Sequence, residues 1–189
     1  AILCAGLVGF TACDSFLDED PKSSLTLDTY YKTSADIIGN VNYLYRDGAP
    51  DKMGNMTGAY RGSSLSVMNM VTGYFVNEYE GQEVDCSYAR QLTRQDFTQS
   101  CCNYLTNDTW KSCYKSINVA NAVIKYVDGV EMDNQAQYKA EARFFRALNY
   151  FYLVKMFGDV PMVTEPTEDA TLVEYPTRTA ASEVFNTVI

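Results

Sequence analysis

The stretch from Tyr138 to Val163 constrains the fold more than any other part of the sequence. Apolar side chains cover most of its helical wheel and cations occupy one narrow stripe, so the helix must pack on several sides and form the core. Gly158 supplies a left-handed C-terminal position, and Pro161 prevents the helix from continuing. The apolar positions are Phe144, Phe145, Leu148, Phe151, Tyr152 and Met156, and the stripe is Lys139, Arg143 and Arg146.

A preceding helical pattern predicts an antiparallel helical hairpin. Asp108 can cap a helix that runs to about Val127, and Asp128-Gly129 makes the turn into the next helix, which is capped by Asp133 or Asn134. Its apolar stripe is Trp110, Tyr114, Ile117 and Ile124. Such hairpins are the repeating unit of tetratricopeptide solenoids, although the tetratricopeptide consensus is not met here.

Three polar residues fall on the apolar faces of this hairpin. Asn118 and Asn121 lie one turn apart, and we expect their amides to bind a neighbouring helix end or loop. Glu141 lies on the apolar arc of the longest helix, where burial requires a partner. We therefore expect Glu141 to pair with a cation or a backbone amide.

The remaining segments predict two shorter helices around an irregular middle. Ser34 can cap a helix that Gly48 ends, and Thr179 can cap a final helix with Val184, Phe185, Val188 and Ile189 as its apolar residues. Glycines interrupt residues 49–107 repeatedly, which predicts short helices joined by long loops. The expected fold class is therefore all-α, with helical hairpins and long irregular loops.

Composition excludes several function classes. The chain carries a formal net charge of −9 and no cationic cluster, which argues against nucleic-acid binding. It contains no histidine, which removes Ser-His and Cys-His nucleophiles and HExxH zinc sites. The acidic run at 78–85 could offer oxygen ligands to calcium but lacks EF-hand spacing. Nothing indicates a metal site or a cofactor, and no catalytic set is visible.

The first residues resemble an export signal. Residues 1–12 are apolar like part of a signal peptide, and Cys13 follows the small residues Thr11 and Ala12, as in a bacterial lipobox. Phe10 departs from the usual leucine, and an ordinary leader cysteine is the alternative. Residues 13–27 suit an acidic tether behind a lipidated Cys13. Because no initiating methionine precedes this run and a helical pattern is still open at Ile189, we expect a fragment.

The other cysteines leave two alternatives open. Cys86, Cys101, Cys102 and Cys113 follow the leader, and adjacent cysteines are poor partners for each other. Exported chains occupy a compartment that permits disulfides. Buried thiols and a single disulfide both fit this pattern.

Four segments in the same order resemble SusD-like (RagB-type) outer-membrane lipoproteins. They are the leader with the opening CDSFLDEDPKSSLTLDTYYKTSADIIGNVNYLY, the helical hairpin, the run AEARFFRALNYFYLVKMFGDVPMV and the segment PTRTAASEVFNTVI. The resemblance covers nearly the whole chain except residues 49–107. It implies tetratricopeptide-like packing, with residues 28–189 as the N-terminal part of a SusD-like helical domain.

The resemblance also implies a function. SusD-like lipoproteins lie on the outer face of the outer membrane, bind oligosaccharides without cleaving them and act with a SusC-like TonB-dependent transporter. The expected partners are therefore this transporter, an oligosaccharide ligand and outer-membrane lipid through acylated Cys13. In this family the N-terminal loops contribute to the ligand site, which makes five residues of the irregular middle candidates: Tyr74, Tyr79, Asp85, Tyr88 and Arg90.

Three alternatives accompany this interpretation. Aromatic rings flanked by carboxylates, amides and guanidinium groups suit a glycan, but the same rings could simply pack the loops onto the helices. A helical-repeat adaptor for a protein or peptide is the second function that the pattern allows. A glycoside hydrolase would need two carboxylates across the scissile bond, and no spacing singles out such a pair.

Overall fold

The computed structural model describes residues 26–46, 71–75, 91, 93–96, 100–168 and 176–189. The described elements are α1 (Leu27–Tyr30), α2 (Ser34–Arg46), α5 (Ser100–Tyr126), the 3-10 turn η3 (Val127–Gly129), α6 (Gln135–Phe157) and α7 (Ala181–Val188). Between these helices, the described part of the chain forms one isolated antiparallel bridge, from Val160 to Thr179. The prediction of an all-α, tetratricopeptide-like fold is confirmed.

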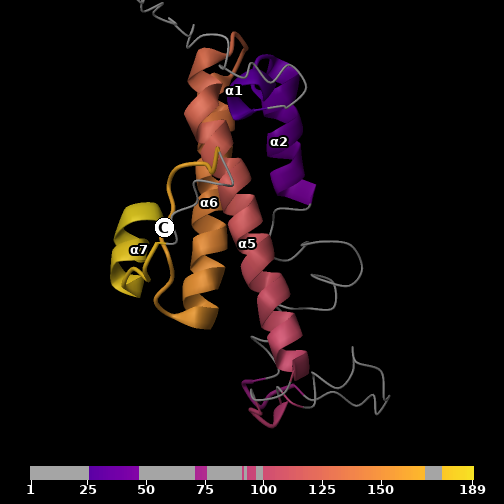
Figure 1. Cartoon of the computed structure of the whole chain (residues 1–189), viewed down its shortest axis with the longest axis vertical. Coiled ribbons are helices and arrows are strands. Elements are labelled where there is room, and N and C mark those ends of the chain that lie inside the picture. The colour runs from indigo at the N-terminus through magenta and orange to yellow at the C-terminus, as the bar shows by residue number, and fades with distance from the viewer. Residues whose placement is uncertain (1–25, 47–70, 76–90, 92, 97–99, 169–175) are drawn as a thin grey trace, which may run out of the picture.

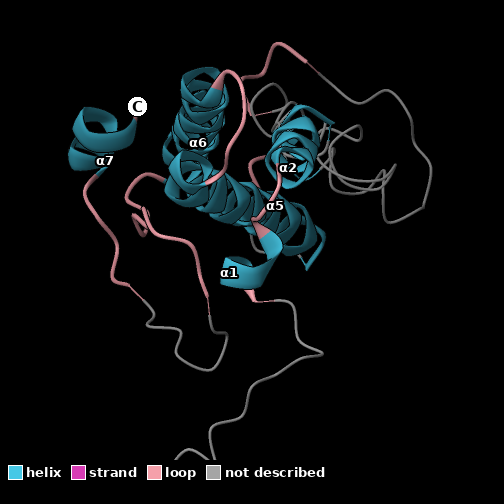
Figure 2. Ribbon diagram, turned by 90° about the horizontal axis from the view of Figure 1, so that it is seen from above, coloured by secondary structure: helices cyan, strands magenta, loops and turns pink. Residues whose placement is uncertain are grey.

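The two long helices α5 and α6 form the predicted antiparallel hairpin, joined by η3 (Figure 1). Helix α2 contacts both of them near the η3 end, whereas α7 contacts the other end of α6. The view along the hairpin shows α2 and α7 on opposite sides of α6 (Figure 2). The longest predicted helix therefore packs on several sides, as its composition indicates.

The core divides into two clusters along the hairpin. The first joins α2 to the η3 end and contains Ile37, Val41, Leu44, Val123, Val127, Ala142 and Phe145. The second joins α7 to the middle of the hairpin and contains Cys113, Ile117, Tyr150, Leu153, Val154, Val160 and Val184. Fully burying one large apolar side chain contributes roughly 1.5–3 kcal/mol, so each cluster holds its outer helix against the hairpin.

The cap of α2 lies one residue earlier than the sequence predicts. Ser34 is the first helical residue, and Thr33 forms a reciprocal capping box with Asp36. The Asp36 carboxylate accepts hydrogen bonds from the backbone amide of Thr33 at 2.8 Å and from its hydroxyl at 2.7 Å. The Asp36 carboxylate also complements the positive end of the helix dipole. The predicted end of this helix at Gly48 lies outside the described residues.

The first hairpin helix is longer than predicted. Helix α5 begins at Ser100, so Asp108 lies inside it and is not its cap. The last residues of the predicted irregular segment 49–107 are therefore helical. At the next helix, Asn134 occupies the N-cap position with φ 61°, but its side chain makes no capping hydrogen bond. The turn at Asp128-Gly129 is confirmed and lies in η3.

Helix α6 buries a different set of residues from the one predicted. Its buried positions are Ala142, Phe145, Asn149, Tyr150, Leu153 and Val154. Two predicted core residues are exposed instead, Phe144 at 60% and Phe151 at 36%. Arg146, predicted for the cationic surface stripe, is half-buried. Among the described residues, the partners of Glu141 are the side-chain amide of Gln137, which donates to it at 2.8 Å, and the Tyr45 hydroxyl, and not the predicted cation or backbone amide.

The turn after α6 holds α7 in place through residues far apart in sequence. Gly158 has φ 70°, which favours glycine, and its amide donates to the Val154 carbonyl at 2.9 Å. Val160 and Thr179 exchange two backbone hydrogen bonds, at 3.2 and 2.9 Å. Asp159 Oδ1 accepts from the Ala181 amide at 2.9 Å. Asp159 therefore caps α7, and the predicted cap Thr179 belongs to the bridge.

Candidate functional site

Five of the residues predicted to have functions lie outside the described residues: Cys13, Tyr79, Asp85, Tyr88 and Arg90. The acidic run at 78–85 lies there too. Tyr74 is described and is 89% exposed, next to Gly73, which has φ 78°. Its amide donates to the Thr72 hydroxyl at 3.3 Å. Tyr74 thus presents a free ring face to solvent, and its role in ligand binding stays a prediction.

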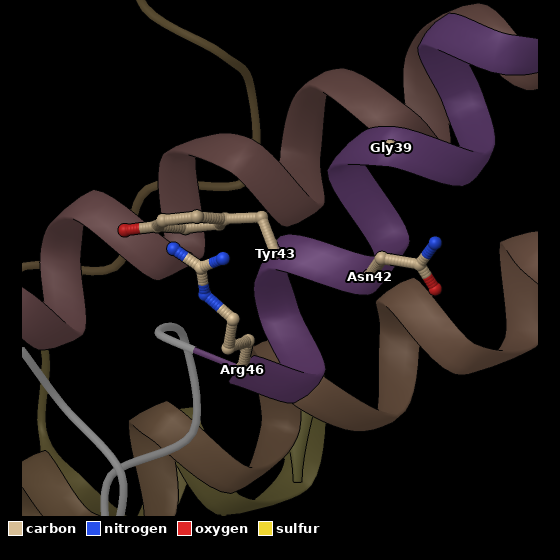
Figure 3. Close-up of a pocket in the computed structure, with 4 residues that line it drawn as sticks. All are labelled: Gly39, Asn42, Tyr43 and Arg46. Atoms are coloured by element: carbon tan, nitrogen blue, oxygen red, sulfur yellow. The ribbon is translucent and has the colours of Figure 1, made fainter.

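A shallow pocket of about 250 Å³ lies on α2 and is lined by Gly39, Asn42, Tyr43 and Arg46 (Figure 3). These residues have i, i+3, i+4, i+7 spacing, so they share the face of α2 next to its buried stripe. Gly39 leaves the floor open, since a Cβ there would meet nothing within 4 Å. The sequence prediction missed this site, although the spacing is visible in the sequence.

Cationic groups gather around the ring of Tyr43. This ring is half-buried and packs against the first core cluster. The ammonium of Lys115, from α5, lies 5.6 Å from the ring centroid, a cation–π distance. The guanidinium of Arg46 lies beside the same ring, whereas Asn42 points to the other side (Figure 3). Two cations from two helices therefore flank one aromatic side chain.

The segment 163–168 is fixed along the hairpin by side chains that the sequence singled out. Asn121 donates to the carbonyls of Val163 at 3.0 Å and Glu165 at 3.2 Å. Asn118 accepts from the Thr167 amide at 2.7 Å. The predicted role of both amides in binding a neighbouring loop is confirmed.

Further groups fix the same segment. Arg146 donates to the Asn121 side chain at 3.1 Å, and desolvation by burial lowers its pKa. The Tyr150 hydroxyl donates to the Val163 carbonyl at 2.9 Å and accepts from the Val163 amide at 2.7 Å. At the end of the segment, Glu168 pairs with Lys125 and accepts from Tyr126 at 2.9 Å. Together, these contacts make 163–168 a structural segment of the hairpin.

Cys113 is a free thiol, whereas the choice between buried thiols and one disulfide stays open for the other cysteines. The Cys113 side chain is fully buried, and burial raises its pKa to about 12. Because the Cys113 thiol stays protonated at neutral pH, it is an unreactive core residue. Cys86 lies outside the described residues, and the side chains of Cys101 and Cys102 are not described.

Two further features of the described residues bear on function. In the part of the chain that the structure describes, no three His, Cys, Asp or Glu side chains gather closely enough to hold a metal ion. None of the described helices combines the length and the apolar character needed to cross a membrane. The described lining of the α2 pocket offers a ring, an amide and a guanidinium, which are groups that can bind a ligand.

Comparison with known proteins identifies relatives along almost the entire chain. A SusD-like family model, described as starch-binding and associating with the outer membrane, matches residues 15–189. The chain is similar to SusD-like protein P25 of Formosa agariphila, with 27% identity over 164 residues, which is 82% of this chain and 29% of that protein. It is also similar to SusD-like protein P2 of the same organism, with 25% identity over 177 residues, which is 93% of this chain and 33% of that protein.

The chain thus spans about a third of the length of these curated relatives. No solved structure gives a significant match. The family match covers α1, α2, the α5–α6 hairpin, the 163–168 segment and α7. The chain therefore belongs to the SusD-like family, whose members are described as starch-binding proteins that associate with the outer membrane.

Proposed function

We propose that this chain is the N-terminal part of a cell-surface lipoprotein that binds oligosaccharides and delivers them to a SusC-like TonB-dependent transporter. The observation that carries the proposal is the family match over residues 15–189. The exposed Tyr74 ring is consistent with it. In this proposal the protein is a receptor and not an enzyme.

The proposal divides the chain into three parts. Residues 1–12 belong to the export signal, residues 13–27 form a tether lipidated at Cys13, and residues 28–189 form the N-terminal part of the helical domain. Several acyl chains on one cysteine give stable attachment, because each buried methylene contributes about 0.8 kcal/mol. Mass spectrometry of the mature amino terminus tests this part. A freely soluble mature protein with an unmodified terminus would contradict it.

Ligand binding is tested with the mature full-length protein and malto-oligosaccharides in isothermal titration calorimetry. We expect saturable binding and no shortened products by chromatography after prolonged incubation. Tyr74→Ala should weaken binding at least roughly tenfold, since a ring that stacks on a sugar loses its apolar contact area. Phe185→Ala, which removes an exposed ring on α7, is the matched control and should leave affinity unchanged.

The transporter partnership has its own test. The lipoprotein should copurify with a SusC-like transporter from detergent-solubilised outer membranes, and Cys13→Ala should release it from the membrane fraction. If the wild-type protein cleaves its ligand, or if it binds no saccharide at all, the receptor proposal is wrong.

A further inference from the structure

One face of α6 stays exposed and apolar although α2, α5 and α7 all contact this helix. Ala140, Phe144, Ala147 and Phe151 lie on this face at positions i, i+4, i+7 and i+11. Phe144 is 60% exposed, Ala140 and Phe151 are also exposed, and Ala147 is half-buried. Because a helix has about 3.6 residues per turn, these four residues form one line along α6, opposite the fully buried Ala142. We call this line the α6 stripe.

The spacing of the α6 stripe is that of a contact between two helices. Apolar residues at alternating intervals of four and three keep facing a partner helix that runs alongside, as in the seam of a coiled coil. Along the stripe, the small Ala140 and Ala147 alternate with the large rings of Phe144 and Phe151. Side chains of a partner helix can pack into the spaces that the alanines leave between the rings. The pattern therefore indicates a further helix along the outer side of α6.

Helix α7 extends the apolar surface beyond α6. The ring of Phe185 is 41% exposed and meets the ring of Phe151 edge-on, with their centroids 6.3 Å apart. Ile189, one turn further, is 43% exposed. At the end of the stripe, the ammonium of Lys155 lies 5.6 Å from the Phe151 ring centroid. An apolar centre with a cation at its edge suits an amphipathic helix that has an acidic residue beside its apolar stripe.

The apolar character of this surface favours a permanent partner. Permanent interfaces are more hydrophobic than those that form and separate. The outermost repeats of helical solenoids need a polar outer face for solubility, and the outer face of α6 is apolar. The stretch shared with this chain is only 29% of SusD-like protein P25 and 33% of SusD-like protein P2. A protein of that length has ample polypeptide of its own to cover the α6 stripe.

We propose that the α6 stripe and Phe185 are the docking surface for an amphipathic helix from the part of the same protein that follows residue 189. This helix packs apolar side chains between Phe144 and Phe151 and places a carboxylate near Lys155. The inference shares with the proposed function only the statement that this chain is the N-terminal part of a longer protein, and it does not depend on glycan binding. Phe185 then contributes to stability and not to ligand contact, so Phe185→Ala stays a control for affinity.

Photo-crosslinking identifies the occupant in the mature full-length protein. Phe144 is replaced by p-benzoylphenylalanine, which keeps an aromatic ring and on irradiation forms a bond to a C–H group within reach. We expect an intramolecular product with the mass of the monomer, in which peptide mapping by mass spectrometry joins residue 144 to a segment beyond residue 189. The same replacement at Phe75, which is 54% exposed and lies outside α6, is the control and should not give this product.

Cysteine labelling measures whether the stripe is covered, without a bulky probe. Ala140→Cys and Ala35→Cys place the same small side chain at exposed positions of α6 and α2. In the native full-length protein, a thiol reagent should label Ala140→Cys at least roughly tenfold more slowly than Ala35→Cys, because the reagent must wait for the docked helix to open. After unfolding, the two variants should react at the same rate. Peptide mapping separates these sites from the native cysteines.

Each other outcome overturns a specific statement. If Ala140→Cys reacts as fast as Ala35→Cys, or if residue 144 forms no cross-link, the stripe is open and the inference is wrong. A cross-link within residues 1–189, to a second copy or to a transporter in outer membranes identifies a different occupant and also refutes it. An open stripe in a protein that binds saccharides refutes only this inference, whereas a covered stripe in a protein that binds none refutes only the receptor proposal.

Discussion

The Val163 carbonyl is the point at which the stability of the hairpin can be tested most sharply. It accepts hydrogen bonds from two buried side chains, Asn121 at 3.0 Å and Tyr150 at 2.9 Å. Asn121 is 1% exposed and Tyr150 is fully buried. We consider Tyr150→Phe, Asn121→Ala and the double variant, which remove these donors one at a time and then together.

Tyr150→Phe keeps the ring and removes only the hydroxyl. It loses two hydrogen bonds to Val163, each with a net contribution of about 0.5–1.5 kcal/mol, and leaves the Val163 amide without this acceptor. We expect the free energy of unfolding to fall by about 2 kcal/mol. Asn121→Ala loses two bonds to carbonyls and one from Arg146, so we expect a loss of about 3 kcal/mol.

The double variant should cost more than the sum of the two single variants. Each single variant leaves the Val163 carbonyl with one donor, whereas the double variant leaves it with neither. An unsatisfied buried polar group costs about 1–3 kcal/mol, which predicts an excess of about 1 kcal/mol for a partly buried carbonyl. Urea unfolding followed by Trp110 fluorescence measures all four proteins, and the slope with urea should stay constant.

Tyr114→Phe provides the control for this cycle. Its hydroxyl donates to a different carbonyl, that of Pro161, at 2.7 Å. We expect a loss of about 1 kcal/mol and additivity with Asn121→Ala within about 0.5 kcal/mol. If the Tyr150→Phe and Asn121→Ala effects are equally additive, water replaces the lost donors and our account of the 163–168 segment is wrong.

Two further predictions concern titratable groups. Burial raises the pKa of Cys113 to about 12, so a thiol reagent at pH 8 should leave this cysteine unmodified in the native protein and label it after unfolding. Peptide mapping by mass spectrometry measures the labelling, and rapid labelling of the native protein would contradict the burial of Cys113. Hydrogen bonds from Thr33 lower the pKa of Asp36, so its contribution to stability is present above the unfolded pKa of about 3.9 and is lost as pH falls through the lower folded value. Asp36→Asn should therefore destabilise the protein at pH 7, and the difference in urea midpoint should shrink in acid; an unchanged difference would indicate that Asp36 does not titrate as a cap.

Local sequence was sufficient for the helical hairpin, its turn and its end. The turn at Asp128-Gly129 and the stop at Gly158 depend on the conformations that single residues prefer, and such preferences act within a few residues. The sequence predicted that the amides of Asn118 and Asn121 bind a neighbouring helix end or loop, because a buried amide requires a hydrogen bond. The same rule could not identify Val163 or Thr167 as the partners.

The errors have a common origin. Periodicity indicates that a segment has an apolar face but not how far the helix continues beyond it, and α5 accordingly begins before the predicted cap Asp108. The wheel of α6 is apolar over so much of its surface that it could not separate the exposed Phe144 from the buried Phe145. Only the positions of α2, α5 and α7 around α6 decide which aromatic rings are buried.

For this protein, the sequence alone determined the helical class and the hairpin, because these follow from spacing within a helix and from local turn chemistry. The family was visible in the sequence as a resemblance of four segments in the same order, and the family match over residues 15–189 bears it out. The tertiary structure decided that Asp159 caps α7, that Val163 lies between Asn121 and Tyr150, and that Lys115 reaches Tyr43. Each of these contacts joins residues that are more than ten positions apart. Their geometry depends on how the helices pack against one another, which no local preference specifies.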